Sequence, residues 1–86
     1  MLIKKKILPE FFELVLKGKK KFEIRLDNFN CKEGDILVLQ EWDPLTKQYT
    51  GREISKKVSL VLKTKNLEFL NKEDINKYGL QIIQLD

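Results

Sequence analysis

A glycine, three lysines and an alternating run occupy residues 18–25, and this stretch constrains the fold more than any other part of the sequence. From Lys20 onward, apolar and charged side chains alternate with a period of two, which is typical of a half-buried strand. Phe22, Ile24 and Leu26 are therefore expected to face a core. Three charged residues, Lys21, Glu23 and Arg25, lie on the opposite face, which is therefore available for chemistry.

The segment before this strand predicts an amphipathic helix. Pro9 suits the first helical position, where a missing N–H is tolerated, and Glu10 complements the helix dipole in the first turn. Apolar residues follow at spacings of three and four up to Leu16, and Gly18 is a natural left-handed end for the helix. One main helix is therefore expected between two strands.

The rest of the chain predicts further strands and a second, shorter helix. The apolar run at 36–39 is typical of a strand buried on both faces, and the alternation over 52–63 predicts a long strand. A hairpin-type connection is expected between them. Asn71 is a cap for a short helix that ends at Gly79. The predicted strands are residues 2–8, 20–26, 36–39, 52–63 and 80–85.

This order of elements predicts an α+β fold, a small mixed pseudo-barrel of about five strands with one main helix and a short second helix. The 86 residues suffice for a single domain, 1–86, with one small core and a shallow cleft. No apolar run approaches the roughly 18 residues that span a membrane, and no signal-peptide pattern opens the chain. A cytoplasmic protein that binds no membrane is expected.

The sequence has one cysteine, Cys31, and no histidine, which excludes several chemistries. An intrachain disulfide, a Cys/His zinc site and a Ser-His or Cys-His nucleophile pair all need residues that are absent. We therefore expect no metal and no cofactor. Cys31 itself is expected to be a small residue packed under a loop.

Positive charge is concentrated near the start of the chain. Residues 1–25 contain eight basic and three acidic side chains, whereas the whole chain has 17 basic and 13 acidic side chains. Such a basic patch is typical of proteins that bind a phosphate-bearing partner, and it is equally typical of a solvated face that keeps a small protein soluble. The charge distribution leaves both interpretations open.

Two groups of residues are candidates for binding a nucleic acid or nucleotide. One group is expected to line a wall of the cleft beside the helix, where lysine acts as a phosphate anchor and Glu23 orients Arg25. The other flanks the hairpin, where Trp42 or Tyr49 could stack on a base and Arg52 could add a phosphate contact or pair with Glu41 or Asp43. The full candidate set is Lys19, Lys20, Lys21, Glu23, Arg25, Trp42, Tyr49 and Arg52.

Four segments carry a resemblance to a known family: residues 16–25 (Leu-Lys-Gly-Lys-Lys-Lys-Phe-Glu-Ile-Arg), 34–37 (Gly-Asp-Ile-Leu), 41–44 (Glu-Trp-Asp-Pro) and 49–52 (Tyr-Thr-Gly-Arg). They resemble the ASCH domain of the PUA-like superfamily, and more closely its small, functionally unassigned bacterial and phage members with a Glu-Trp-Asp-Pro segment. The resemblance implies a PUA-like pseudo-barrel. It also implies that RNA, or a nucleotide or nucleoside, binds in the cleft beside the first helix.

One branch of that family implies an alternative, an amidohydrolase that removes the acetyl group of acetylated cytidine. Its catalytic lysine corresponds to Lys20, and the position of its catalytic threonine is occupied here by Glu23. In this alternative Lys20 is the base and Glu23 is the polarising or nucleophilic group. Whether the chain is an enzyme, and its oligomeric state, stay open at this point.

Overall fold

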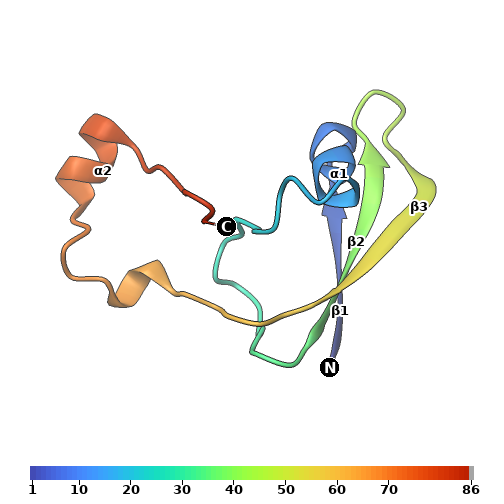
Figure 1. Cartoon of the computed structure of the whole chain (residues 1–86). Coiled ribbons are helices and arrows are strands. Elements are labelled where there is room, and N and C mark those ends of the chain that lie inside the picture. The colour runs from blue at the N-terminus through green and yellow to red at the C-terminus, as the bar shows by residue number, and fades with distance from the viewer. Residues whose placement is uncertain (86) are drawn as a thin grey trace.

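The computed structural model describes residues 1–85 and places three strands in one open sheet (Figure 1). Strand β1 (Leu2–Ile7) lies at one edge, β2 (Ile36–Asp43) in the centre and β3 (Gln48–Lys57) at the other edge. β1 runs parallel to β2, from the pair Leu2–Ile36 to the pair Ile7–Glu41. β3 is antiparallel to β2, so the sheet combines a helical crossover with a hairpin.

Helix α1 (Pro9–Leu16) packs on one face of the sheet and forms the core with it. Pro9 begins the helix as predicted, and Gly18 follows its end with a φ of 75°, a conformation that favours glycine. The inward stripe of the helix, Phe12 and Val15, meets apolar side chains of β1 and β2. The buried core residues are Ile7, Phe12, Val15, Leu37 and Leu39.

The predicted five-stranded pseudo-barrel is wrong: the fold stays α+β, but the described residues form an open sheet of three strands. Residues 20–26 have no regular secondary structure and pair with no strand, and Ile24 and Leu26 are 64% and 80% exposed. The segment 80–85 is also unpaired. The alternation of apolar and charged residues is compatible with a strand, but a strand also needs a neighbouring strand to pair with. The periodicity of one segment does not identify that partner.

The predicted long strand over 52–63 is also corrected. Its pairing with β2 ends at Lys57, because the partner strand begins at Ile36. A tight connection closes the sheet there: Gly34 donates to the carbonyl of Val58 at 2.8 Å, and Val58 donates to the carbonyl of Asp35 at 2.8 Å. Beyond Val58 the chain leaves the sheet, and residues 59–63 belong to no strand.

The C-terminal third extends away from the sheet and then returns to the segment that follows α1 (Figure 1). It contains a short 3-10 helix, Thr64–Asn66, and helix α2 (Lys72–Tyr78). As predicted, Asn71 caps the N-terminus of α2, and Gly79 ends the helix with a φ of 73°. Gln84 then donates to the carbonyl of Lys19 at 3.2 Å and accepts from the backbone N–H of Lys21. Within residues 1–85, none of the helices is both long and apolar enough to cross a membrane.

Candidate functional site

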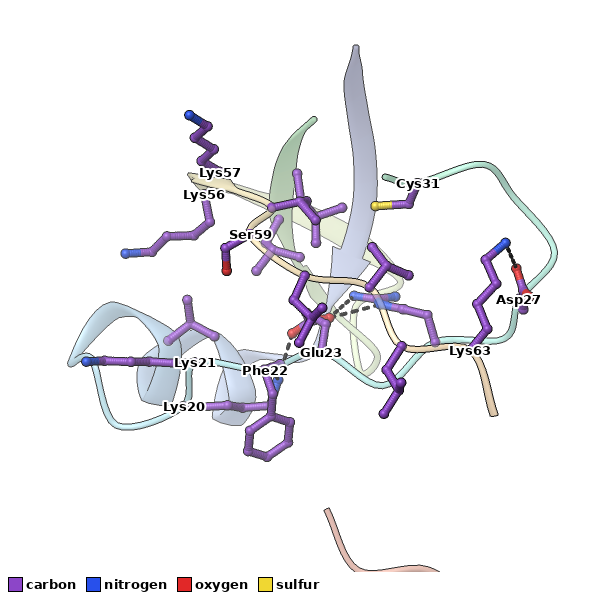
Figure 2. A pocket seen from close by; sticks show the side chains of 18 of the residues that line it. Lys20, Lys21, Phe22, Glu23, Asp27, Cys31, Lys56, Lys57, Ser59 and Lys63 are labelled. Atoms are coloured by element: carbon purple, nitrogen blue, oxygen red, sulfur yellow. Dashed lines mark hydrogen bonds and ion pairs between the residues drawn. The ribbon is translucent and has the colours of Figure 1, made fainter. Parts of the chain in front are cut away.

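A cleft of about 640 Å³ lies on the same face of the sheet as α1 (Figure 2). Its floor is apolar and includes Val15 of α1 together with Leu37 and Leu39 of β2. The walls are two irregular segments that leave the sheet region, one spanning residues 20–31 and the other residues 58–64. The cleft therefore exists because these two segments do not pair as strands.

The lining of the cleft is strongly basic. Two carboxylates, Glu23 and Asp27, face six cations, so the lining has an excess of four positive charges. Figure 2 shows Lys20 and Lys21 on one side of the cleft and, on another, Lys56 and Lys57, whose side chains diverge from the end of β3. We call the six cations the basic rim: Lys20, Lys21, Arg25, Lys56, Lys57 and Lys63.

Glu23 is the organising carboxylate of this site. Its Oε1 accepts from Lys20 Nζ at 2.7 Å and its Oε2 accepts from Arg25 Nε at 2.9 Å. The side chains of Lys20, Glu23 and Arg25 are 14%, 18% and 28% exposed, so the Lys20–Glu23 pair is part-buried and the Arg25–Glu23 pair lies nearer the surface. The expectation that Glu23 lies within reach of a cation is confirmed. Lys21, Glu23 and Arg25 all line the cleft, although the segment that carries them is not a paired strand.

Lys20 and Arg25 are each held by a second contact. Lys20 Nζ also donates to the carbonyl of Phe22 at 2.7 Å and lies 5.0 Å from the centre of its ring. Arg25 donates through Nη2 to the carbonyl of Lys6 in β1 at 2.6 Å. Both cations are therefore fixed in place before any ligand arrives.

The other four cations of the basic rim differ in whether a carboxylate forms a salt bridge with them. Lys63 lies 3.4 Å from Asp27 in an exposed pair. Within residues 1–85, Lys21, Lys56 and Lys57 form no salt bridge. These three ammonium groups carry charge that no carboxylate of the described chain offsets, so they are the groups best able to bind an anion.

Trp42, Tyr49 and Arg52 do not line the cleft. Trp42 and Tyr49 are direct partners across β2 and β3, and the ammonium of Lys6 lies 4.4 Å and 5.8 Å from their ring centres. Lys6 alternates with the core residue Ile7 along β1, so these rings lie on the face of the sheet opposite α1. Lys19 is exposed and contributes its carbonyl, not its side chain, to the contact with Gln84.

Arg52 belongs to an ion-pair network that joins the sheet to α1. Its Nε and Nη2 each donate to Glu41 at 2.9 Å, and Nη2 also donates to Glu13 at 2.6 Å. The pairing with Glu41, one of two partners expected from the sequence, is confirmed. The hydrogen bonds from Arg52, and to a smaller extent the one from Thr50, hold the pKa of the buried Glu41 carboxyl below its ordinary value of 4.5. The same carboxylates raise the pKa of Arg52.

Asp35 is the second buried carboxylate, 4% exposed, and it closes the start of β2. A hydrogen bond from the backbone N–H of Lys32 and a contact at 3.0 Å with the α-ammonium of Met1 hold the pKa of Asp35 below 3.8. Cys31 is half-buried and lines the cleft. No group of three or more His, Cys, Asp or Glu residues within the described part of the chain is arranged to hold a metal ion.

Three of the six cleft cations were not predicted from the sequence: Lys56, Lys57 and Lys63. They are at least 31 residues from Arg25 along the chain, and only the tertiary fold brings them to the same cleft. One local signal was present, since the adjacent Lys56 and Lys57 interrupt the apolar series of Ile54 and Val58. Two neighbouring charges at the end of a strand indicate that the chain leaves the core there.

Comparison with known proteins gives a family and one relative. Residues 3–74 match a protein family described as a domain of unknown function (DUF3850). The chain is 37% identical over 54 residues to an uncharacterised 12.9 kDa protein from Escherichia phage P2. That match covers 63% of this chain and 48% of the phage protein, so the chain spans about half the length of that relative. No solved structure matches the chain significantly.

Proposed function

We propose that this chain, which belongs to the DUF3850 family, binds single-stranded RNA or a nucleotide in the cleft beside α1. The observation that carries the proposal is the basic rim, an excess of four positive charges around an apolar floor. Phosphate groups supply the negative charge that such a rim attracts, and a base supplies the flat apolar surface that such a floor accepts. A duplex would offer the phosphates but would keep its bases stacked inside.

The roles of the rim residues follow from their contacts. Lys21, Lys56 and Lys57, which lack a salt bridge within residues 1–85, bind phosphates. Lys20 and Arg25, fixed by Glu23, present donors in constant positions in the lining of the cleft. The resemblance to the ASCH domain supports the same proposal, because RNA binding beside the first helix is what that family implies. A cytoplasmic location is part of the proposal, since RNA is abundant there.

Salt dependence of RNA binding tests this proposal. Three phosphate contacts by the three unpaired ammonium groups give a slope of log affinity against log salt of about −2 for a single strand. Anisotropy of a labelled oligouridylate measures this slope. The variant with Lys56→Ala and Lys57→Ala should reduce the slope to about −0.7, whereas Lys77→Ala on α2 should leave it unchanged. Absence of binding at low salt, or an unchanged slope in the double variant, would refute the proposal.

One contact favours an amidohydrolase as the second candidate. Lys20 Nζ and Glu23 Oε1 lie 2.7 Å apart in the cleft, so the two residues assigned to this activity are in contact; the third catalytic residue of that family branch has no assigned counterpart in this chain. In this contact the ammonium donates to two oxygens, whereas a general base must be the neutral amine. Incubation with acetylated cytidine, followed by chromatography, distinguishes the candidates. Deacetylation that Lys20→Ala abolishes would establish the enzyme, and no turnover in the native chain would exclude it.

A further inference from the structure

We propose that a nucleic-acid strand held in the cleft continues over the free edge of β1 and stacks a base on the far face of the sheet. The stacking surface is the aromatic pair, which we define as Trp42 and Tyr49. This inference rests on the proposed function and extends it, because a site on two faces takes an oligonucleotide rather than a single nucleotide.

The aromatic pair is available for stacking. Tyr49 is 53% exposed, and Trp42 is half-buried beside it as its direct cross-strand partner. Helix α1 packs on the other face of the sheet and does not cover these rings. The Lys6 ammonium, 4.4 Å and 5.8 Å from the ring centres of Trp42 and Tyr49, would move from the rings to a phosphate of the incoming strand. Stacking of bases on exposed aromatic rings tolerates any sequence, because every base has a π-face.

Arg25 connects the cleft to this second surface. It lines the cleft, and its Nη2 donates to the carbonyl of Lys6 at 2.6 Å. Since β1 is an edge strand, this contact places the guanidinium at the outer margin of the sheet. From that margin to Tyr49 on β3 there are two strand spacings, about 10 Å, a distance that a few nucleotides of extended backbone cover.

Lys6 provides a cation on the far side of the same edge. Its carbonyl faces Arg25 while its ammonium lies over the ring of Trp42. Lys6 forms no salt bridge within the described part of the chain, so its charge is free to bind a phosphate. Arg25 and Lys6 thus place one cation on each side of the edge that the strand would cross.

Trp42 is the sole tryptophan of the sequence, so its fluorescence reports contact with the far face directly. The probes are uridine monophosphate, which fills the cleft alone, and an octamer of uridylate, which is long enough to cross the edge. Both should bind, but only the octamer should quench Trp42. Tyr49→Ala should weaken octamer binding about 5- to 150-fold, the loss expected for one stacked base, and leave monophosphate binding unchanged.

Tyr78→Ala is the matched control, because Tyr78 is 74% exposed and also has a lysine ammonium, that of Lys77, 5.2 Å from its ring centre. It should bind the octamer normally. An octamer that binds no tighter than the monophosphate and leaves Trp42 unquenched would overturn this inference alone. If neither probe binds, the proposed function and this inference both fail. The quenching measurement uses the unaltered chain, so the test does not depend on the folding of any variant.

Discussion

Replacement of Glu23 by glutamine tests how much the ion pairs of the cleft contribute to stability. The variant keeps the size of the side chain and removes the charge that Lys20 and Arg25 share at 2.7 Å and 2.9 Å. Exposed pairs contribute roughly 0.2–1 kcal/mol, and breaking a fully buried pair costs about 3–5 kcal/mol. Because these side chains are 14–28% exposed, each pair should contribute toward the upper end of the exposed range. The expected loss for both is therefore about 1–2 kcal/mol.

Urea unfolding followed by circular dichroism measures this loss. For a domain this small the free energy of unfolding changes by about 1 kcal/mol per molar urea, so the midpoint should fall by about 1–2 M. Double-mutant cycles with Lys20→Met and Arg25→Met should assign about 0.5–1 kcal/mol to each pair. Glu68→Gln is the control, because Glu68 is exposed and forms no salt bridge within residues 1–85.

Two results would refute this reasoning. A loss below about 0.3 kcal/mol would show that the carboxylate is solvated and fixes neither cation. A loss above about 3 kcal/mol would show that Glu23 belongs to the scaffold rather than to the binding site. RNA affinity of the same variant adds an independent reading. It should fall, because Arg25 loses a contact that positions it, whereas a gain would show that Glu23 only neutralises the cleft.

Two further predictions concern the fold. The lowered pKa values of Glu41 and Asp35 mean that their stabilising contacts are complete above their ordinary values of 4.5 and 3.8 and are lost as pH falls below them. The melting temperature should therefore be nearly constant from pH 7 to about pH 5 and fall on further acidification, less steeply for Glu41→Gln; an equal fall in that variant would contradict the assignment. Phe12→Ala should cost about 3–5 kcal/mol by chemical denaturation, since Phe12 is 2% exposed in the core, whereas Phe69→Ala, at 77% exposure, should cost little. Equal losses in the two phenylalanine variants would show that α1 does not pack on the sheet as described.

Local signals in the sequence were sufficient for the elements that depend on neighbouring residues. Pro9 and Gly18 marked the ends of α1, and Asn71 marked the start of α2. Each of these signals acts within one turn of helix, so no knowledge of the rest of the chain is needed.

Sheet pairing depends on residues far apart in the chain, and the strand pairing predicted from local sequence patterns was wrong. The alternation at 20–26 resembles a strand, yet the backbone N–H of Lys21 bonds to the side chain of Gln84, 63 residues away. The cleft was predicted beside α1, but only one of its walls was identified. The second wall begins where β3 leaves the sheet, and the lysines next to it at the end of β3, Lys56 and Lys57, were not predicted.

The irregularity in the pairing of β2 with β3 limits how the length of this hairpin can change. Between the pairs Gln40–Glu53 and Trp42–Tyr49, three residues of β3 lie opposite the single residue Glu41, and the middle one is Gly51 at φ 93°. Side chains change face at every residue, so the two extra residues leave Tyr49 and Glu53 on the same face. Loss or gain of one residue here would turn Tyr49 toward the core. Insertions and deletions at this point preserve both faces of the sheet only in steps of two.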